Sequence, residues 1–483
     1  MLWGKKQVLA YRFRGAEKGK RLERVKNLTN TPSYSGDIQA PGKPAACPDT
    51  SMTRNLPLFI AFRLLFNARF YYPLFAVIQL DYGLTMAQFA IMNAIWAVSI
   101  VILEVPSGAL ADRIGRKRMV VGAAILMVLE MAVLAFVPFG NNTVVFWAWV
   151  VNRILSGAAE AAASGADEAL AYDSIPHAEQ KTRWPQVLSR LMRLSSIAFV
   201  FAMLTGAAVY DPDLVNRALA WLGSGWTVDK ETVIRFPIYL TLGTAICAVV
   251  VTSLMREPPL ETECGGESSM WSGILSAGGW IVKTPLVAGV ILAALVHDSV
   301  ARVFLTTASE YYRLIGIPVV WFGVIGAGFS ALGIFTPKLA EWLVAHRTMR
   351  ANYLLVSFFI LLGLIGIGFA IPHWGVAVVV FFSVGFGLLN FFTSHYLNAQ
   401  VDSRNRATVL SFKGLALNLG FGAISLLYGG ILRFLKNGDE STAADPAFRE
   451  SLFWLPGIFL VLFAGLFLYY QLRMKAAMRR ELP

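Results

Sequence analysis

Long runs of hydrophobic residues, separated by short polar segments, make up most of this 483-residue chain. Twelve runs between residues 56 and 472 reach the roughly 20 residues that a helix needs to cross a bilayer. Lipid offers the backbone no water partners, so such runs are helical in a membrane. The pattern predicts an all-α integral membrane protein with spans at residues 56–80, 86–110, 119–138, 143–172, 186–210, 236–255, 285–310, 317–343, 351–371, 374–398, 407–432 and 451–472.

The composition agrees with this prediction, since 56% of residues are hydrophobic and only 15% are charged. Soluble domains carry about 25% charged residues. With the N-terminus inside, cytoplasmic segments hold 27 of the 42 Lys and Arg residues and outer loops hold seven, the bias of a multi-pass protein with both termini cytoplasmic. We expect the plasma membrane, in bacteria the inner membrane. The net charge of +12 follows from this bias and from anionic lipid, so it predicts no nucleic-acid partner.

The polar ends of the chain are expected to be cytoplasmic tails. Residues 1–55 and 473–483 are basic, and the first of these tails is expected to be disordered, with Met52 as an alternative start. The first hydrophobic run has full length, so no cleavable signal peptide is predicted. The chain's cysteines, Cys47, Cys247 and Cys264, fall in cytoplasmic segments or in a span, so no disulfide is expected.

A polar linker at residues 256–284 divides the spans into six-helix bundles at residues 56–255 and 285–472. The halves share short similarities: "LAD" (110–112) and "LAE" (339–341), like "YDS" (172–174) and "VDS" (401–403), are separated by the same offset of 229 residues. Two matches at one offset favour an ancient duplication. Repeated halves are a common design of secondary transporters, with the substrate site between them near the membrane midplane.

A dense charged segment, "GALADRIGRKR" (108–118), follows the second span. It resembles the G-x-L-x-D-R-x-G-R-[RK] signature of the major facilitator superfamily, and "NRILSGAAEAA" (152–162) resembles that family's R-x-x-x-G-x-x-x-A pattern. The resemblance covers about residues 56–472 and implies two pseudo-symmetric bundles that carry out secondary transport. Span five lacks the Gly-Pro pair typical of the family's drug antiporters, which argues against that subclass.

The resemblance also implies a cytoplasmic latch between the halves. Asp112 is expected near the N-terminus of span eleven, where free N–H groups favour an anion, and Arg116 is expected to meet Asp173 or, as second choice, Glu168. In the second half the corresponding acids, Glu341 and Asp402, are present, but the residue that corresponds to Arg116 is Ala345. We interpret the latch as half of an originally symmetric pair whose other half has lost its arginine. The residues assigned to the latch are Gly108, Asp112, Arg113, Gly115, Arg116, Lys117, Asp173, Glu341 and Asp402.

Ionisable side chains inside spans are costly and usually face the interior of the bundle. In span four, Arg153, Gly157, Glu160, Ser164 and Asp167 recur every three or four residues and would form one stripe along a helix. We interpret the stripe as a substrate or proton path with Glu160 as its titratable carboxylate. The alternative is a static network that fixes helix packing.

Span one carries Arg63 and Asn67 on one face and Arg69 about 120° away. Guanidinium groups bind carboxylates and phosphates in bidentate fashion, so these arginines suit an anionic substrate. The alternative is that they neutralise Glu104 of span two and the acids of span four.

Further candidates lie in the second half. Asp298 and Arg302 form an i,i+4 pair that is expected to be mutually neutralising, and His297 is either a proton-coupling group or a simply hydrogen-bonded residue. The last two pathway candidates are Asn390 of span ten and Lys413 of span eleven. Lys413 either contacts the substrate or only extends its ammonium group to the membrane–water interface.

These features predict alternating-access transport of a small organic solute, anionic or amphipathic, coupled to protons, by a monomer in contact with membrane lipids. Two alternatives stay open: translocation of a lipid or lipid-like substrate, and a non-transporting sensor on the same fold. The sequence carries no phosphate-binding loop, metal-ligand spacing or nucleophile motif, so neither an enzyme nor a cofactor or metal is predicted.

Overall fold

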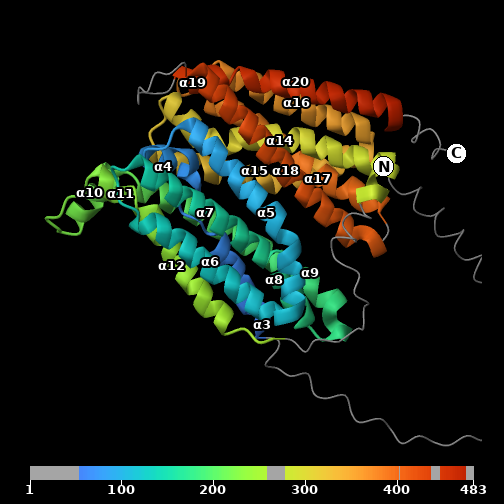
Figure 1. Cartoon of the computed structure of the whole chain (residues 1–483), viewed down its shortest axis with the longest axis horizontal. Helices are drawn as coiled ribbons and strands as arrows, with labels where there is room; N and C mark the ends of the chain where they lie inside the picture. Colours follow the sequence, from blue (N-terminus) through green and yellow to red (C-terminus); the bar gives the residue numbers. More distant parts are fainter. Residues whose placement is uncertain (1–53, 258–277, 402, 437–445, 475–483) are drawn as a thin grey trace, which may run out of the picture. The chain divides into compact units, whose positions relative to one another are not determined.

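A computed structural model describes residues 54–257, 278–401, 403–436 and 446–474, and in these ranges every regular element is helical (Figure 1). Ten of the described helices are long and apolar enough to cross a membrane. The protein is therefore an all-α, multi-pass membrane protein. The bundle boundaries and the cytoplasmic position of the termini remain predictions.

The helices follow the order of the predicted spans. They are α3 (Asn55–Asn67), α4 (Phe75–Asp81), α5 (Met86–Ile114), α6 (Arg116–Phe136), α7 (Asn142–Ala163), α8 (Ala166–Asp173), α9 (His177–Val209), α10 (Pro212–Trp221), α11 (Lys230–Val233), α12 (Phe236–Ser253), α14 (Pro285–Leu314), α15 (Val320–His346), α16 (Met349–Gly368), α17 (Val376–Gln400), α18 (Ser403–Leu435), α19 (Pro446–Ser451) and α20 (Trp454–Tyr469), with short turns η1 (Tyr72–Leu74) and η2 (Tyr470–Met474).

Span one is broken, so the prediction of one continuous helix over residues 56–80 is wrong. Helix α3 ends at Asn67, and the chain continues through η1 into α4. Pro73 is the second residue of η1, in the first turn, where its missing N–H leaves no hydrogen bond unmade. Arg69 consequently lies in the connection and not on a helix face.

Span four is broken too. Ser164 ends α7, and Gly165 has φ of +76°, a left-handed conformation that glycine adopts readily and that stops the helix. The predicted stripe is therefore continuous only from Arg153 to Glu160. Asp167 lies on the separate helix α8.

The charged segment after span two is mostly helical and not a loop. Thr85 caps the N-terminus of α5 and forms a capping box with Gln88, and the helix continues to Ile114. Gly115 alone makes the turn into α6, with φ of +97°. One glycine in the left-handed region is enough to connect two helices here.

Three helix pairs join the first half of the chain (residues 54–257) to the second half (residues 278–474). Helix α5 packs along α18, α9 along α15, and α4 against α14. Within the halves, α6 packs against α7 and α12, and α14 against α17 and α20 (Figure 1). Exposed side chains such as Trp147, Phe358 and Val461 point outward, as expected for helices in contact with lipid.

Candidate substrate cavity

A cavity of about 160 Å³ lies between helices of the two halves. We call this cavity the arginine chamber. The residues that line it are Arg69, Tyr71, Tyr72, Phe75, Asn93, Trp96, Arg153, Ser156, Glu160, Arg302, Thr306 and Phe421. The first nine of these residues belong to η1 and its approach, α4, α5 and α7, and the last three to α14 and α18. Three guanidinium groups and one carboxylate are thus brought together from distant parts of the sequence.

Arg69 is neutralised by an acid that the sequence analysis did not single out. Its guanidinium donates to the Glu130 carboxylate of α6 at 2.5 Å and to the Tyr71 hydroxyl at 3.1 Å. Glu130 is 0% exposed and Arg69 4%. The signal available in the sequence was a single acid in the apolar run "MVLEMAV" of span three. The predicted alternative, that Arg69 neutralises Glu104 or the acids of span four, is wrong because Glu130 is its partner.

Arg153 differs from the other two arginines of the chamber because among the described residues no carboxylate pairs with it. Its guanidinium donates to the Asn152 amide oxygen at 2.7 and 3.0 Å and lies over the rings of Phe75 and Trp149. Asn152 in turn donates to the carbonyl of Glu130. Arg153 is therefore held in place by neutral groups and keeps its full charge for a ligand.

Arg302 is paired within its own helix, as the sequence predicts. The guanidinium contacts the Asp298 carboxylate at 2.5 Å and also donates to Asn418 of α18 at 3.0 Å. Lys413 of α18 is close enough to Asp298 to interact with it electrostatically. The structure therefore contains the Asp298–Arg302 ion pair, and α18 supplies additional polar partners.

Glu160 is the carboxylate of the chamber wall. In the described part of the chain its carboxylate has no hydrogen-bond or ion-pair partner, and Glu104 of α5 interacts with it electrostatically. It lies seven residues after Arg153 on α7, so the two Cα atoms are about 10 Å apart along one helix face. The chamber therefore presents one free cation and one free acid two turns apart.

A larger cavity of about 390 Å³ adjoins the arginine chamber and shares Tyr72, Phe75 and Thr306 with it. Aromatic and small side chains of α9, α14, α15 and α17 supply most of its wall, including Phe199, Tyr312, Phe322, Phe329 and Phe386. We call it the aromatic chamber. A third space of about 320 Å³ shares Phe199 and Ser330 with it and is lined by Asn67 of α3. The arginine chamber thus supplies a charged region, and the aromatic chamber beside it supplies a largely apolar one.

Other predicted pathway residues lie outside the arginine chamber. Arg63 donates to Asp167 at 3.0 Å, a contact that agrees with the neutralising alternative for this arginine. Asn67 donates to the carbonyl of Arg63, and Asn390 to that of Phe386 within its own helix. His297 of α14 is fully buried against α16 and α20 and lines a separate groove in the second half.

The predicted latch is described in part. Arg116 contacts Asp173, the partner expected first. Asp112 is expected to approach residues 406–409. The side chains of Asp112 and of residues 406–408, and the whole of Asp402, lie outside the described residues, whereas Arg113 and Glu341 are exposed. Glu257, which the sequence analysis missed, accepts hydrogen bonds from the backbone N–H groups of Arg116 and Lys117 at 2.8 Å and so caps α6.

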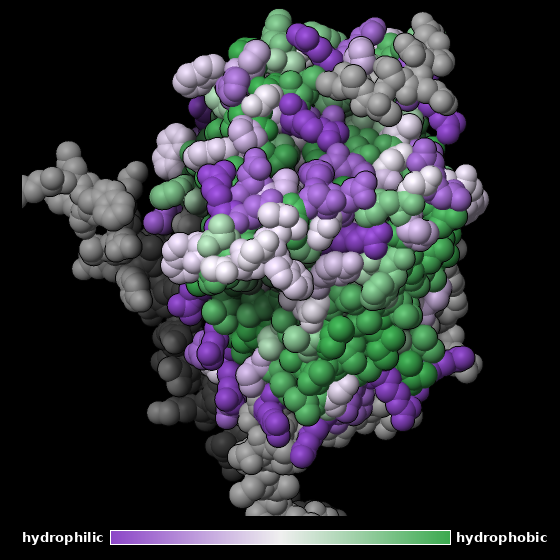
Figure 2. Space-filling view, turned by 90° about the vertical axis from the view of Figure 1, so that its left-hand side faces the viewer, coloured by the Kyte–Doolittle hydropathy of each residue, from purple (hydrophilic) through white to green (hydrophobic). Residues whose placement is uncertain are grey.

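A second cluster that the sequence analysis missed joins the two halves at the other end of the spans. Asp81 of α4 accepts hydrogen bonds from Arg313 of α14 at 2.7 Å and from the Tyr210 hydroxyl at 2.6 Å, and Lys230 lies 3.4 Å away. We call these four residues the Asp81 cluster. Nearby, Ser309 accepts hydrogen bonds from the N–H groups of Ala76 and Val77. The end of the molecule where α10 and α11 lie shows hydrophilic side chains beside hydrophobic surface (Figure 2).

Comparisons with known proteins agree with this architecture. The family model described as Major Facilitator Superfamily matches residues 58–425. A mutant of the nucleoside transporter NupG superposes with a TM-score of 0.66 at 12% identity, covering 87% of this chain and 100% of that chain. A bacterial homologue of the human lysosomal transporter Spinster, inward-facing and unoccupied, superposes with a TM-score of 0.66 at 16% identity, covering 89% of this chain and 98% of that chain. A D-xylose–proton symporter superposes with a TM-score of 0.61 at 12% identity, covering 88% of this chain and 98% of that chain. No curated protein sequence matches significantly.

Proposed function

The chain belongs to the major facilitator superfamily, a family of membrane transporters and not of enzymes, and from this premise we propose that it moves a small organic anion by alternating access. The substrate would bind in the arginine chamber with its charge at Arg153 and its apolar part in the aromatic chamber. The observation that carries the proposal is a buried guanidinium in a cavity between the halves, without a carboxylate partner among the described residues. A guanidinium in such surroundings binds carboxylate or phosphate groups strongly.

The geometry of the chamber supports coupling to protons. Arg69 and Arg302 already have acidic partners, so Glu160 decides how much uncompensated positive charge faces the substrate. Protonating Glu160 removes a negative charge about 10 Å from Arg153 and favours an anion in the chamber. Proton and anion would then travel together, in symport.

The Asp81 cluster supports alternating access. It links α4 of the first half to α14 of the second half at the end of the spans that the charge bias places outside. The contacts have to break for the chambers to open on that side. At the opposite end, the Asp112 region would act as the corresponding cytoplasmic latch in the plasma membrane.

The function is tested by flux into proteoliposomes containing the full chain, with a panel of carboxylates and phosphate esters, their neutral analogues, and organic cations. We expect uptake of an anion with an apolar part. An inward proton gradient would concentrate it up to about tenfold per pH unit, because one unit corresponds to about 1.4 kcal/mol. Glu160→Gln is expected to lose the response to the gradient, and Glu231→Gln on the exposed helix α11 serves as the charge-matched control.

Exclusive transport of neutral solutes or cations would contradict the anion assignment. An unchanged response in Glu160→Gln would instead exclude Glu160 as the coupling group. The size of the aromatic chamber favours one second candidate, a lipid-like anion. In that case the same panel would show flux only for long-chain members, whereas a sensor on this fold would transport none of them.

The Asp81 cluster makes its own prediction. Asp81→Asn weakens contacts to three partners, so we expect the outer side to open more often, by about fivefold for a net loss of about 1 kcal/mol. The measurement is labelling of Thr306→Cys, in a chain whose native cysteines are serines, by a membrane-impermeant thiol reagent. Asp213→Asn on exposed α10 is the control. Equal labelling rates in the two variants would show that the cluster does not hold the outer side closed.

A further inference from the structure

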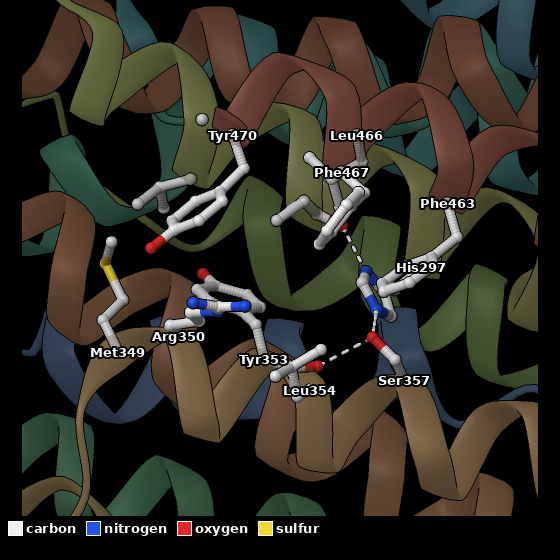
Figure 3. A pocket seen from close by; sticks show the side chains of 13 residues that line it. His297, Met349, Arg350, Tyr353, Leu354, Ser357, Phe463, Leu466, Phe467 and Tyr470 are labelled. Atoms are coloured by element: carbon white, nitrogen blue, oxygen red, sulfur yellow. Dashed lines mark hydrogen bonds between the residues drawn. The ribbon is translucent and has the colours of Figure 1, made fainter. Parts of the chain in front are cut away.

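A groove on the second half of the chain lies apart from the chambers and shares no lining residue with them. It is formed by α14, α16 and the end of α20 with η2, and it encloses about 70 Å³ (Figure 3). Sites that enclose a drug-sized molecule measure roughly 300–1,000 Å³. This groove therefore suits a ligand that inserts only one narrow part and lies mostly outside.

The deep part of the groove is apolar because its polar groups already have partners. His297 is hydrogen-bonded through Nδ1 to the carbonyl of Ala293 at 2.6 Å and through Nε2 to the Ser357 hydroxyl at 2.7 Å. Phe463 and Phe467 flank the imidazole (Figure 3). A polar ligand would gain no hydrogen bond here, whereas a hydrocarbon chain would fill the space without unpairing any group.

The groove reaches the outer surface of the helices. Leu354 of α16 and Phe467 of α20 line it, and each is 44% exposed. Both lie on helices that are long and apolar enough to cross a membrane. An acyl chain of a bilayer lipid can therefore enter sideways, without passing through the protein.

Positive charge gathers at one end of the groove. Arg350 lines it, and its guanidinium lies over the Tyr470 ring, 5.0 Å from the centroid, with Tyr353 beside it (Figure 3). No Asp or Glu of the described chain lines the groove, and Lys283 and Arg473 lie near the same helix ends. A ligand with a negative head group matches this charge.

We propose that the groove binds an anionic phospholipid, with the phosphate at Arg350 and one acyl chain along Leu354 and Phe467 toward His297. Basic pockets between membrane helices on the cytoplasmic side commonly bind anionic head groups, which agrees with the side that the charge bias assigns to this end. The site is independent of the transported substrate, because it lies outside both chambers.

The test uses the purified full chain in nanodiscs of neutral lipid, with phosphatidylglycerol or phosphatidylcholine carrying identical brominated acyl chains. Quenching of the chain's tryptophan fluorescence reports occupancy by each lipid. We expect saturable quenching by brominated phosphatidylglycerol. In Arg350→Gln the affinity for this lipid should be about fivefold lower, because one basic residue contributes about 1 kcal/mol to binding an anionic lipid. Leu354→Phe, which adds bulk to the groove without adding a tryptophan and keeps Arg350, is expected to reduce the competition of unlabelled phosphatidylglycerol for the brominated lipid.

The matched control is Arg347→Gln, which removes the same charge three residues before Arg350, at the C-terminal end of α15, from a residue that does not line the groove. If it weakens binding as much as Arg350→Gln does, general surface charge explains the effect and the proposal is wrong. Equal affinity for phosphatidylcholine would exclude recognition of the anionic head group. Displacement by glycerol phosphate alone would exclude a role for the acyl chain. Thermal unfolding of each variant shows that it is folded.

Discussion

Arg153→Gln is expected to reduce anion transport by about 10- to 100-fold, because a charge-assisted hydrogen bond to a buried ligand contributes about 1.5–3 kcal/mol. Arg153 is 3% exposed, and Asn152, Phe75 and Trp149 hold its guanidinium in place. Water therefore has little access to the site and cannot substitute for the guanidinium as a partner of the substrate. The measurement is initial uptake of the anion identified in the flux panel, at several substrate concentrations.

Arg153→Lys is the matched variant, since it keeps the charge but loses the planar fork. We expect it to recover part of the affinity but to leave KM above the wild-type value. Arg217→Gln on exposed α10 should behave like the wild type. If Arg153→Gln transports the anion with unchanged KM and kcat, the substrate charge does not bind at this residue.

Arg69→Gln is expected to cause the largest loss of stability, about 3–5 kcal/mol, because it leaves the Glu130 carboxylate buried without its partner. One oxygen of that carboxylate already lacks a hydrogen bond among the described residues. The measurement is the temperature at which the detergent-solubilised protein loses its monodisperse peak in size-exclusion chromatography. Arg183→Gln is the control, since the side chains of both Arg183 and its partner Glu179 are exposed.

The double variant Arg69→Leu with Glu130→Leu separates the cost of an unpaired charge from loss of the pair itself. Buried ion pairs are often replaced by apolar residues at little cost, so the double variant should be more stable than Arg69→Gln. Its transport is expected to remain impaired because Arg69 lines the arginine chamber. A single variant as stable as the wild type would show that Glu130 does not depend on Arg69.

Sequence patterns predicted correctly the features that depend on residues close together in the chain. Hydrophobic length predicted the helices because each backbone group in lipid must pair within its own segment. The i,i+4 pair of Asp298 and Arg302 followed from helical spacing alone. The family resemblance placed Arg116 beside Asp173, and the structure shows that contact.

The helix breaks were harder to predict, although their signals are present. The "ARFYYP" segment that ends at Pro73 and the Ser164–Gly165 pair each lie within an apolar run of spanning length. Hydropathy counts apolar residues without regard to backbone conformation, so it joined α3 to α4 and α7 to α8. The breaks matter because they move Arg69 into a connection and Asp167 onto a separate helix.

The sequence by itself determined that this is a multi-pass helical transporter of a known superfamily, because hydrophobic length and a short charged motif are properties of contiguous residues. Only the tertiary structure decided which charges are free. Glu130 neutralises Arg69 from 61 positions away, and Asp81 meets Arg313 across 232 positions. Pairing inside a low-dielectric protein depends on distances between helices, which spacing along one helix does not contain. That is why Arg153, one of several arginines in the sequence, becomes the candidate anion site only in the folded chain.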